Sequence, residues 1–138
     1  MNPKKFLDEF GKICEEFQNV HFHKECVPEI LDIVLKSGYE REFLKQFLKL
    51  LKIAAENGEQ VVGLDSFEIL KYTNTQNDIY SMKLKSKSYN IRILYILDDM
   101  SQLYLHCFYE RQGDSRTDYT EKIPIAIERI NELLEETG

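Results

Sequence analysis

The chain has 138 residues, of which 43% are hydrophobic and 30% charged, and its formal net charge is −6. This composition is typical of a single soluble globular domain, and the negative charge argues against broad nucleic-acid binding while leaving room for a local basic site. No apolar run approaches the roughly 18 residues of a membrane span, and the N-terminus lacks the apolar core of a secretory signal. Three widely spaced cysteines fit reduced thiols. We therefore expect a cytoplasmic protein, and no motif indicates a membrane or a small-molecule cofactor.

Helical spacing of apolar residues dominates the first half of the chain. Asn2 followed by Pro3 is a favourable helix start, an N-cap with proline at the first helical position. A stripe of phenylalanines then continues to about Gln18. Two further helices are predicted over 28–37 and about 39–57, with a glycine between them. Two consecutive helices joined by a short connection are expected to form a helical hairpin.

The segments between and after these helices are shorter or less regular. Residues 20–23 alternate and are compatible with a short strand. After the third helix, the stretch from Gly63 to Ser66 has the composition of a turn, with Ser66 placed to cap a short helical piece through Tyr72. Apolar residues at helical spacing over 119–136 predict a closing helix.

Residues 79–111 read IYSMKLKSKSYNIRILYILDDMSQLYLHCFYER, three strand-like runs separated by two turn-like breaks. The first run alternates apolar and polar residues, and the middle run is apolar on both parities, as in a central strand covered on both faces. A two-residue turn at Lys87 and Ser88 would place Tyr80 opposite Tyr95 on the core side. The predicted class is α+β: N-terminal helices including a helical hairpin, an antiparallel sheet of three to four strands, and a closing C-terminal helix.

Arg92 is the only charged residue in the middle run, and the predicted register places it opposite Lys83 on the face away from the core. Like charges opposed across strands are unfavourable, so an anionic partner should lie nearby. One explanation is an intramolecular Asp or Glu, because charges inside sheets are normally paired. The other is a nucleic-acid phosphate, for which an Arg/Lys pair on a sheet is a suitable receptor.

Four short motifs follow one another in the second part of the chain. They are Ile79–Lys83, Asn90–Tyr95, His106–Arg111 and Ala126–Arg129. With these motifs in this order and spacing, the chain resembles the RelE/ParE superfamily of bacterial toxins, most closely its HigB-like, phage-derived branch. The resemblance implies a RelE-like core of a helical hairpin, three strands and a final helix. It covers roughly residues 20–136 of a single domain, 1–138, and leaves the first helix, 1–18, as an addition.

The resemblance implies a toxin of a type II toxin–antitoxin system, a ribosome-dependent endoribonuclease that cleaves mRNA, inhibits translation and is silenced by a cognate antitoxin. Such cleavage needs no metal, because the 2′-hydroxyl attacks the adjacent phosphate with help from a base, a cationic clamp and an acid. By motif match, Arg92 would hold the scissile phosphate, Lys83 would assist it and Arg111 would be a second cation. Glu110 is a candidate general base or only a neighbour of Arg111. The candidate substrate-binding residues are Lys85, His106 and Arg116.

The chain departs from the family pattern at two places. Glu110-Arg111 stands where the family has Lys-Lys, and Lys83 stands where it has arginine. With the net charge of −6, these departures favour a second hypothesis, a non-catalytic protein–protein interaction module such as an inactivated toxin or a phage- or plasmid-encoded inhibitor. A third hypothesis is an α+β domain unrelated to the family.

A possible zinc site and some of the candidate substrate-binding residues have simpler explanations. His21, His23 and Cys26 are metal-ligating residue types, but a structural zinc site needs four ligands and only three lie together. His106 is equally compatible with a plain surface histidine. A solvated edge that protects the first strand from aggregation would explain three lysines without any substrate: Lys83, Lys85 and Lys87.

Overall fold

The computed structural model describes residues 1–70, 77–110 and 118–137. Its helices are α1 (Pro3–Glu16), α2 (Cys26–Val34), α3 (Glu40–Asn57) and α4 (Lys122–Thr137), with a short 3-10 helix, η1 (Gly58–Val61), after α3. Its strands are β1 (Val20–Phe22), β2 (Phe67–Leu70), β3 (Ile79–Lys85), β4 (Asn90–Asp98) and β5 (Ser101–Tyr109). The predicted α+β class is confirmed. Within this described part of the chain, no helix combines the length and apolar character that crossing a membrane requires.

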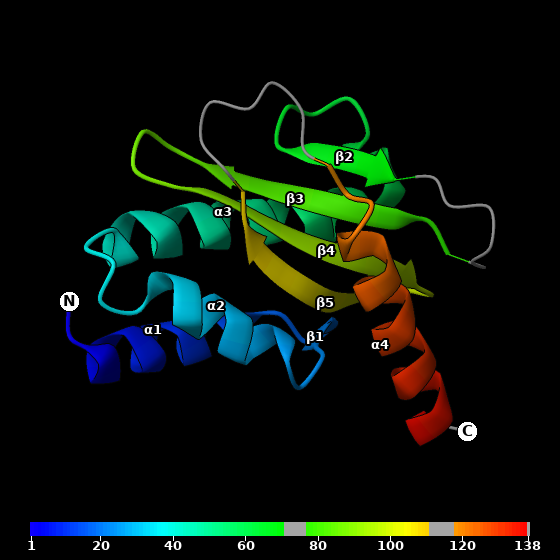
Figure 1. The fold of residues 1–138 in the computed structure, drawn as a ribbon, viewed down its shortest axis with the longest axis horizontal. Helices are drawn as coiled ribbons and strands as arrows, with labels where there is room; N and C mark the ends of the chain where they lie inside the picture. The colour runs from blue at the N-terminus through cyan, green and yellow to red at the C-terminus, as the bar shows by residue number, and fades with distance from the viewer. Residues whose placement is uncertain (71–76, 111–117, 138) are drawn as a thin grey trace.

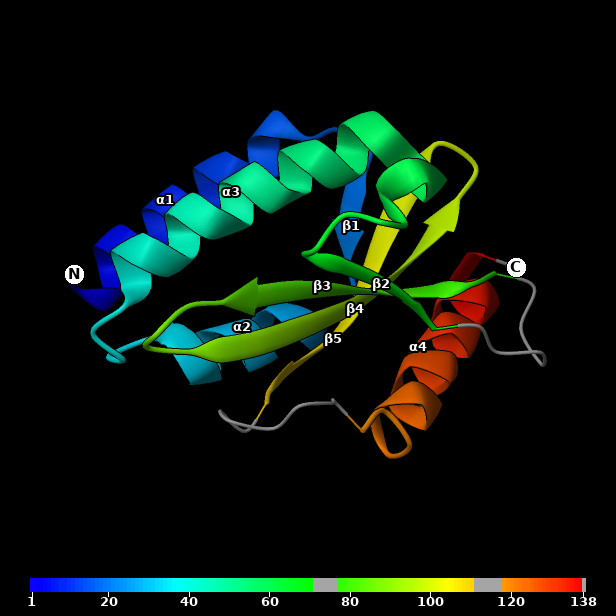
Figure 2. The ribbon, with the colours of Figure 1, turned by 90° about the horizontal axis from the view of Figure 1, so that it is seen from above.

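One twisted sheet separates the helices (Figures 1 and 2). α1 and α3 lie side by side over one face, which we call the first face, α4 covers part of the opposite, second face, and α2 lies along β5. α2 and α3 run in opposite directions but do not pack as the predicted helical hairpin, because α3 packs on α1 whereas α2 packs on β5. The ring centroids of Phe6 and Phe43 lie 6.4 Å apart, and those of Phe10 and Phe47 lie 5.4 Å apart. The first helix is therefore part of the core.

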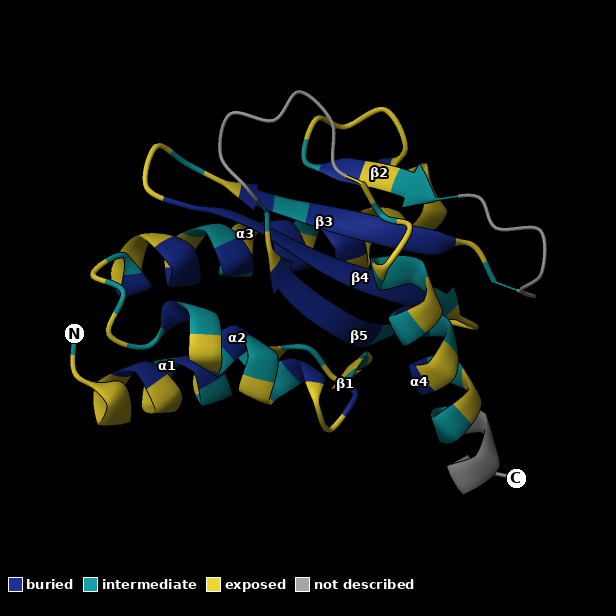
Figure 3. Ribbon diagram, viewed as in Figure 1, coloured by how far each residue is buried: buried dark blue, intermediate teal, exposed yellow. Residues whose placement is uncertain are grey.

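The sheet has five strands in the order β1-β5-β4-β3-β2. β3, β4 and β5 form the predicted meander, and the predicted register is confirmed, with Lys83 opposite Arg92. The Ser86 amide donates to the Tyr89 carbonyl at 2.9 Å, which closes the predicted two-residue turn. The three strands are buried along most of their length (Figure 3).

Two short edge strands correct the prediction of an antiparallel sheet with three to four strands. β1 pairs parallel with β5, so the sheet is mixed. β2 occupies residues 67–70, where the sequence predicts a helical piece capped by Ser66. The Ser66 carbonyl accepts from the Lys83 amide at 2.8 Å, and Phe67 is buried opposite Met82. Strand pairing and burial of this ring outweigh the capping preference of a serine, which is worth about 1 kcal/mol.

Aromatic side chains close the first face. Tyr95 has no exposed surface and stacks between Tyr80 and Tyr104, with ring centroids 5.4 and 4.8 Å away. Tyr104 in turn stacks on Phe22, with ring centroids 5.2 Å apart, and the Phe22 ring lies tilted against Phe47 of α3 at 6.3 Å. Tyr95 therefore packs in the core, as the register predicts.

The second face is divided into an apolar half and a polar half. Under α4, the buried apolar residues are Ile79, Leu94, Ile96, Leu105, Phe108 and Ala126. Leu94 pairs with His106 whereas Tyr95 pairs with Tyr104, so Leu105 is the extra residue of a β-bulge and joins this cluster. Toward the turn between β3 and β4, the same face carries polar side chains instead.

Candidate functional site

Cross-strand neighbours build the polar half of the second face. Lys83, Arg92 and Phe108 form one row across the sheet, and Lys85 and Asn90 form the next row toward the turn. Directly opposed side chains have Cβ atoms about 4.5–5.5 Å apart, so the two rows are one continuous surface. Lys83 is half-buried and Lys85 is exposed. We call the four polar residues the cationic patch: Lys83, Lys85, Asn90 and Arg92.

Arg92 lies at the centre of the cationic patch, and only 6% of its surface is exposed. Its Nη1 donates to Asn90 Oδ1 and, at 3.4 Å, to the Ile91 carbonyl. Among the residues whose side chains the structure describes, 1–70, 77–110 and 118–133, Nε has no hydrogen-bond partner and no carboxylate forms an ion pair with the guanidinium. Buried charges are normally paired, so the lack of a carboxylate in the described part of the chain favours an external anion.

Tyr119 forms the border between the cationic patch and α4. Its hydroxyl donates to Glu68 Oε2 at 2.8 Å and lies 3.0 Å from Ser81 Oγ. Burial raises the pKa of this phenol, and so does the Glu68 carboxylate. The Ser81 hydrogen bond and the Arg92 charge lower it, but they are outweighed, and the pKa of Tyr119 is raised overall. The hydroxyl therefore stays protonated at neutral pH and acts as a hydrogen-bond donor rather than a base.

The other predicted catalytic residues lie at or beyond the end of β5. Glu110 is half-buried, and its amide donates to the Asn90 carbonyl at 2.7 Å, which places it beside the cationic patch. Arg111 and Arg116 lie outside the described residues. The predicted site residues that the structure brings together are Lys83, Lys85, Arg92 and Glu110.

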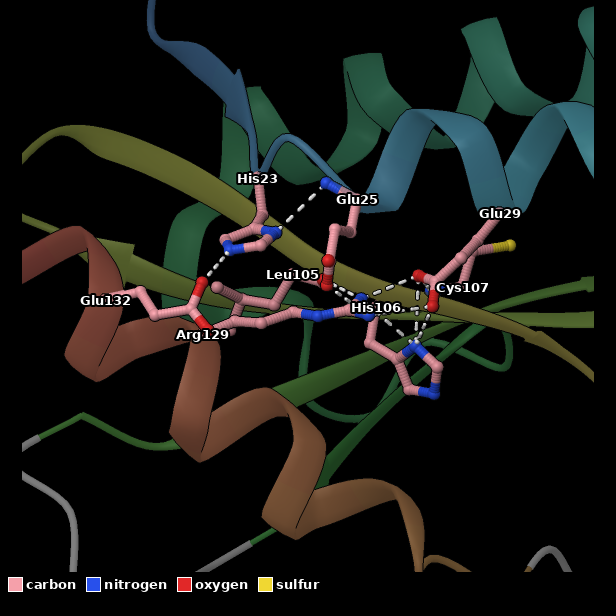
Figure 4. Close-up of polar contacts among 8 residues, drawn as sticks. All are labelled: His23, Glu25, Glu29, Leu105, His106, Cys107, Arg129 and Glu132. Atoms are coloured by element: carbon pink, nitrogen blue, oxygen red, sulfur yellow. Dashed lines mark hydrogen bonds and ion pairs between the residues drawn. The ribbon is translucent and has the colours of Figure 1, made fainter.

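His106 lies on the second face but belongs to a different cluster, drawn in Figure 4. Its Nδ1 lies 2.9 and 3.0 Å from the two carboxylate oxygens of Glu29. An ionised carboxylate only accepts hydrogen bonds, so Nδ1 carries the proton and donates it. Nε2 is buried and has no partner among the described residues. The ring is therefore engaged with α2 rather than with the cationic patch, and its predicted role in substrate binding stays a prediction.

Glu29 is the centre of this arrangement, which we call the Glu29 cluster (Glu29, His106 and Arg129). Its carboxylate accepts from Arg129 Nη1 and Nη2 at 2.7 and 3.0 Å, and from the Cys107 amide at 3.1 Å. Burial acts to raise the pKa of Glu29, but the hydrogen bonds from His106, Arg129 and the Cys107 amide outweigh burial and lower it to about 2. The cluster therefore contains an ionised carboxylate at neutral pH.

The Glu29 cluster completes an open strand edge. β1 covers β5 only from Gln102 to Tyr104, so the next groups on that edge lack a strand partner. The Leu105 carbonyl accepts from Arg129 Nη1 at 2.8 Å, and the Cys107 amide donates to Glu29. Side chains of α2 and α4 thus form the hydrogen bonds that these two backbone groups of β5 lack, and they join both helices to the strand edge. Sequence reasoning missed this pairing, and its only signal was the Ala-x-x-Arg motif that contains Arg129.

His23, from the zinc alternative, is engaged at both ring nitrogens. Nδ1 accepts from the Glu25 amide at 3.1 Å, so Nε2 is the protonated nitrogen and donates to Glu132 Oε2 at 2.8 Å. Cys26 is fully buried, and burial raises its pKa, which disfavours the thiolate that binds zinc. No group of three His, Cys, Asp or Glu side chains in the described ranges is arranged to hold a metal ion. These contacts favour a structural role for both residues.

Comparisons of the chain with protein-family models, with curated proteins and with solved structures give no match. Function is therefore inferred from the residues of the site itself.

Proposed function

We propose that the chain is a toxin of a type II toxin–antitoxin system that cleaves mRNA on the ribosome and is held inactive by a cognate antitoxin. The observation that carries the proposal is the nearly buried Arg92 guanidinium, whose one side-chain partner among the described residues is the neutral Asn90. A fixed cation without a protein anion is suited to bind a phosphate. The four motifs that resemble RelE/ParE toxins support the same function.

The cationic patch and Glu110 provide groups for metal-independent RNA cleavage. In this reaction the 2′-oxygen bonds to the adjacent phosphorus while the bond to the 5′-oxygen breaks, which leaves a 2′,3′-cyclic phosphate and a 5′-hydroxyl. Arg92 neutralises the charge that grows on the non-bridging oxygens, with Arg111 as a second cation. Glu110 takes the proton of the 2′-hydroxyl, and Lys83 donates a proton to the leaving 5′-oxygen.

Induced expression in bacteria tests the proposal. The wild type and Lys24→Ala, which changes an exposed lysine outside the site, are expected to arrest growth and to cleave mRNA at ribosome-occupied positions. Arg92→Ala is expected to relieve both effects while the protein remains folded. Normal growth with intact mRNA, from a folded wild type present in amounts comparable to the ribosome, would contradict the nuclease.

Variants that keep the fold can separate binding from chemistry. Arg92→Lys retains the charge but loses the planar guanidinium, so RNA affinity and cleavage should both fall. Glu110→Gln should abolish cleavage while RNA binding is retained, because the amide cannot accept the 2′-proton. Equal cleavage by Glu110→Gln would remove this residue from the catalytic assignment.

One observation favours a second candidate function, a non-catalytic interaction module on the same fold. His106 donates to Glu29, so among the described residues the second face offers no unengaged imidazole for acid–base catalysis. The net charge of −6 also opposes a large RNA interface. Under this candidate, the wild type binds a protein partner and leaves mRNA intact, which the same expression experiment detects.

A further inference from the structure

A groove runs between α1 and α3 on their solvent-exposed side. Its volume is about 400 Å³, and the apolar residues that line it include Ile13 of α1 and Leu44 and Leu48 of α3. Ile13 and Leu44 are buried, whereas Leu48 is half-buried. Because both helices supply lining residues, the groove depends on α1, the helix outside the region of family resemblance.

Basic side chains border this apolar floor. Lys12 of α1 and Arg41 and Lys45 of α3 line the groove together with one acid, Glu9. All three basic residues are exposed, and none of them forms an ion pair with a side chain of residues 1–70, 77–110 or 118–133. Three positive charges and one negative charge give the lining side chains a net charge of +2, whereas the side chains of the whole chain carry −6.

Helical spacing produces the layout of the groove. Arg41 and Lys45 are four residues apart, and so are Leu44 and Leu48, so α3 presents a line of cations beside a line of leucines. Lys12 places a further cation on the α1 side. The result is an apolar strip with two cations on the α3 side and with Lys12 beside Glu9 on the α1 side. It extends over about two helical turns, or roughly 10 Å of α3.

We propose that this groove binds an acidic amphipathic helix of a protein partner. Apolar side chains at positions i, i+3 or i+4, and i+7 of such a helix enter the groove, and its flanking Asp and Glu residues pair with Lys12, Arg41 and Lys45. The floor favours a protein over a nucleic acid, because a phosphate backbone has no apolar group to bury against Leu48. The groove contains no residue of the cationic patch, so the inference is independent of the proposed nuclease.

A displayed library of short amphipathic helices provides the probe, with leucine on one face and Glu, Lys or Gln varied at the flanking positions. The bait is the full chain. Selection is expected to enrich Glu beside the leucines, and the resulting consensus peptide should shift the NMR signals of Lys12, Leu44 and Leu48 in the isotope-labelled protein. Enrichment of Lys, no enrichment, or shifts confined to other surfaces would overturn the proposal.

A matched pair of double variants tests the charges. Arg41→Glu with Lys45→Glu is expected to weaken binding of the consensus peptide by at least about tenfold, because two attractions become repulsions. Lys24→Glu with Lys36→Glu makes the same change of net charge at exposed positions outside the groove, and is expected to change affinity by less than about twofold.

The apolar floor is tested by Leu48→Gln, which should weaken the peptide while thermal unfolding shows an intact domain. Equal losses in the two charge-reversed chains, or full binding to Leu48→Gln, would contradict the assigned occupant. Competition by RNA or by anionic vesicles at this groove, or self-association of the chain through it, would also overturn the proposal in favour of a different occupant.

Discussion

The two faces of the sheet bury their side chains in different ways. The first face is closed by rings from α1, α3 and the strands, and Tyr95 at its centre has no exposed surface. The second face is apolar under α4, but its other half carries a nearly buried arginine that no carboxylate of the described residues pairs with.

Both faces arise from the same strand, because side chains alternate along β4. Ile91, Ile93 and Tyr95 point to the first face, whereas Asn90 and Arg92 lie on the second. A buried cation without an anion is costly, and proteins retain such groups chiefly where they serve a function. The comparison therefore separates a face that stabilises the domain from a face that is suited to bind.

The largest effect is expected on the first face. Phe47 is fully buried against the rings of Phe10, Phe22 and Phe43, so Phe47→Ala should lower the free energy of unfolding by about 3–5 kcal/mol. Urea denaturation measures this loss. Leu7→Ala, at a side chain of α1 that is 45% exposed, serves as the control and should stay within about 0.5 kcal/mol. Equal effects would contradict the assignment of stability to the first face.

The Glu29 cluster should give the next largest effect, because it joins α2 and α4 to the edge of β5. Glu29→Gln removes the anion from Arg129 and should lower the free energy of unfolding by about 2 kcal/mol. Glu25→Gln is the matched control. Glu25 also contacts Arg129, at 3.1 Å, but its side chain is 59% exposed, so the expected loss is below about 0.5 kcal/mol.

The same carboxylate makes stability depend on pH. Folding lowers the pKa of Glu29 from an ordinary 4.5 to about 2, so its contribution is fully present above the unfolded pKa and is lost as the pH falls toward 2. The stability difference between wild type and Glu29→Gln should therefore shrink by about 2 kcal/mol between about pH 5 and about pH 2. Urea denaturation across this range measures it, and a constant difference would exclude Glu29 as the titrating group.

A smaller effect, in the opposite direction, is expected from Gly11→Ala in α1. A Cβ added at Gly11 would meet no atom within 4 Å apart from its chain neighbours and the nearby backbone of its own helix, and the residue lies inside α1. Alanine should raise the free energy of unfolding by about 0.5–1 kcal/mol, because the unfolded chain loses conformational freedom. The RNA binding proposed for the cationic patch should not change. Thermal unfolding and an RNA-binding titration together test whether stability and binding belong to different faces.

Arg92→Met should have only a small effect on stability and a large effect on binding. The substitution removes a buried guanidinium whose Nε has no partner among the described residues, but it also leaves Asn90 Oδ1 without its donor. The free energy of unfolding should change by no more than about 1 kcal/mol, whereas RNA affinity should fall at least about tenfold. A large loss of stability with unchanged RNA binding would assign Arg92 to the structure instead.

Much of this organisation could be predicted from local sequence signals. Asn2 caps α1 as expected, since its Oδ1 accepts from the Lys5 amide at 2.8 Å. The register that places Lys83 opposite Arg92 follows from the alternation of β3 and the length of one turn, because a slip of one residue would exchange the two faces. The core of the cationic patch was therefore predictable, whereas β2 was not, since a four-residue edge strand carries too little periodicity.

The amino-acid sequence by itself determined the class, the helices and the pairing in the meander, because each depends on spacing within a short segment. Only the tertiary structure decided which distant side chains meet. Glu29 and Arg129 are separated by 100 positions and pair because short β1 leaves the edge of β5 open. The groove between α1 and α3 likewise exists because two amphipathic helices pack side by side. Hydrophobic periodicity says which face of an element is buried, but not which element buries it.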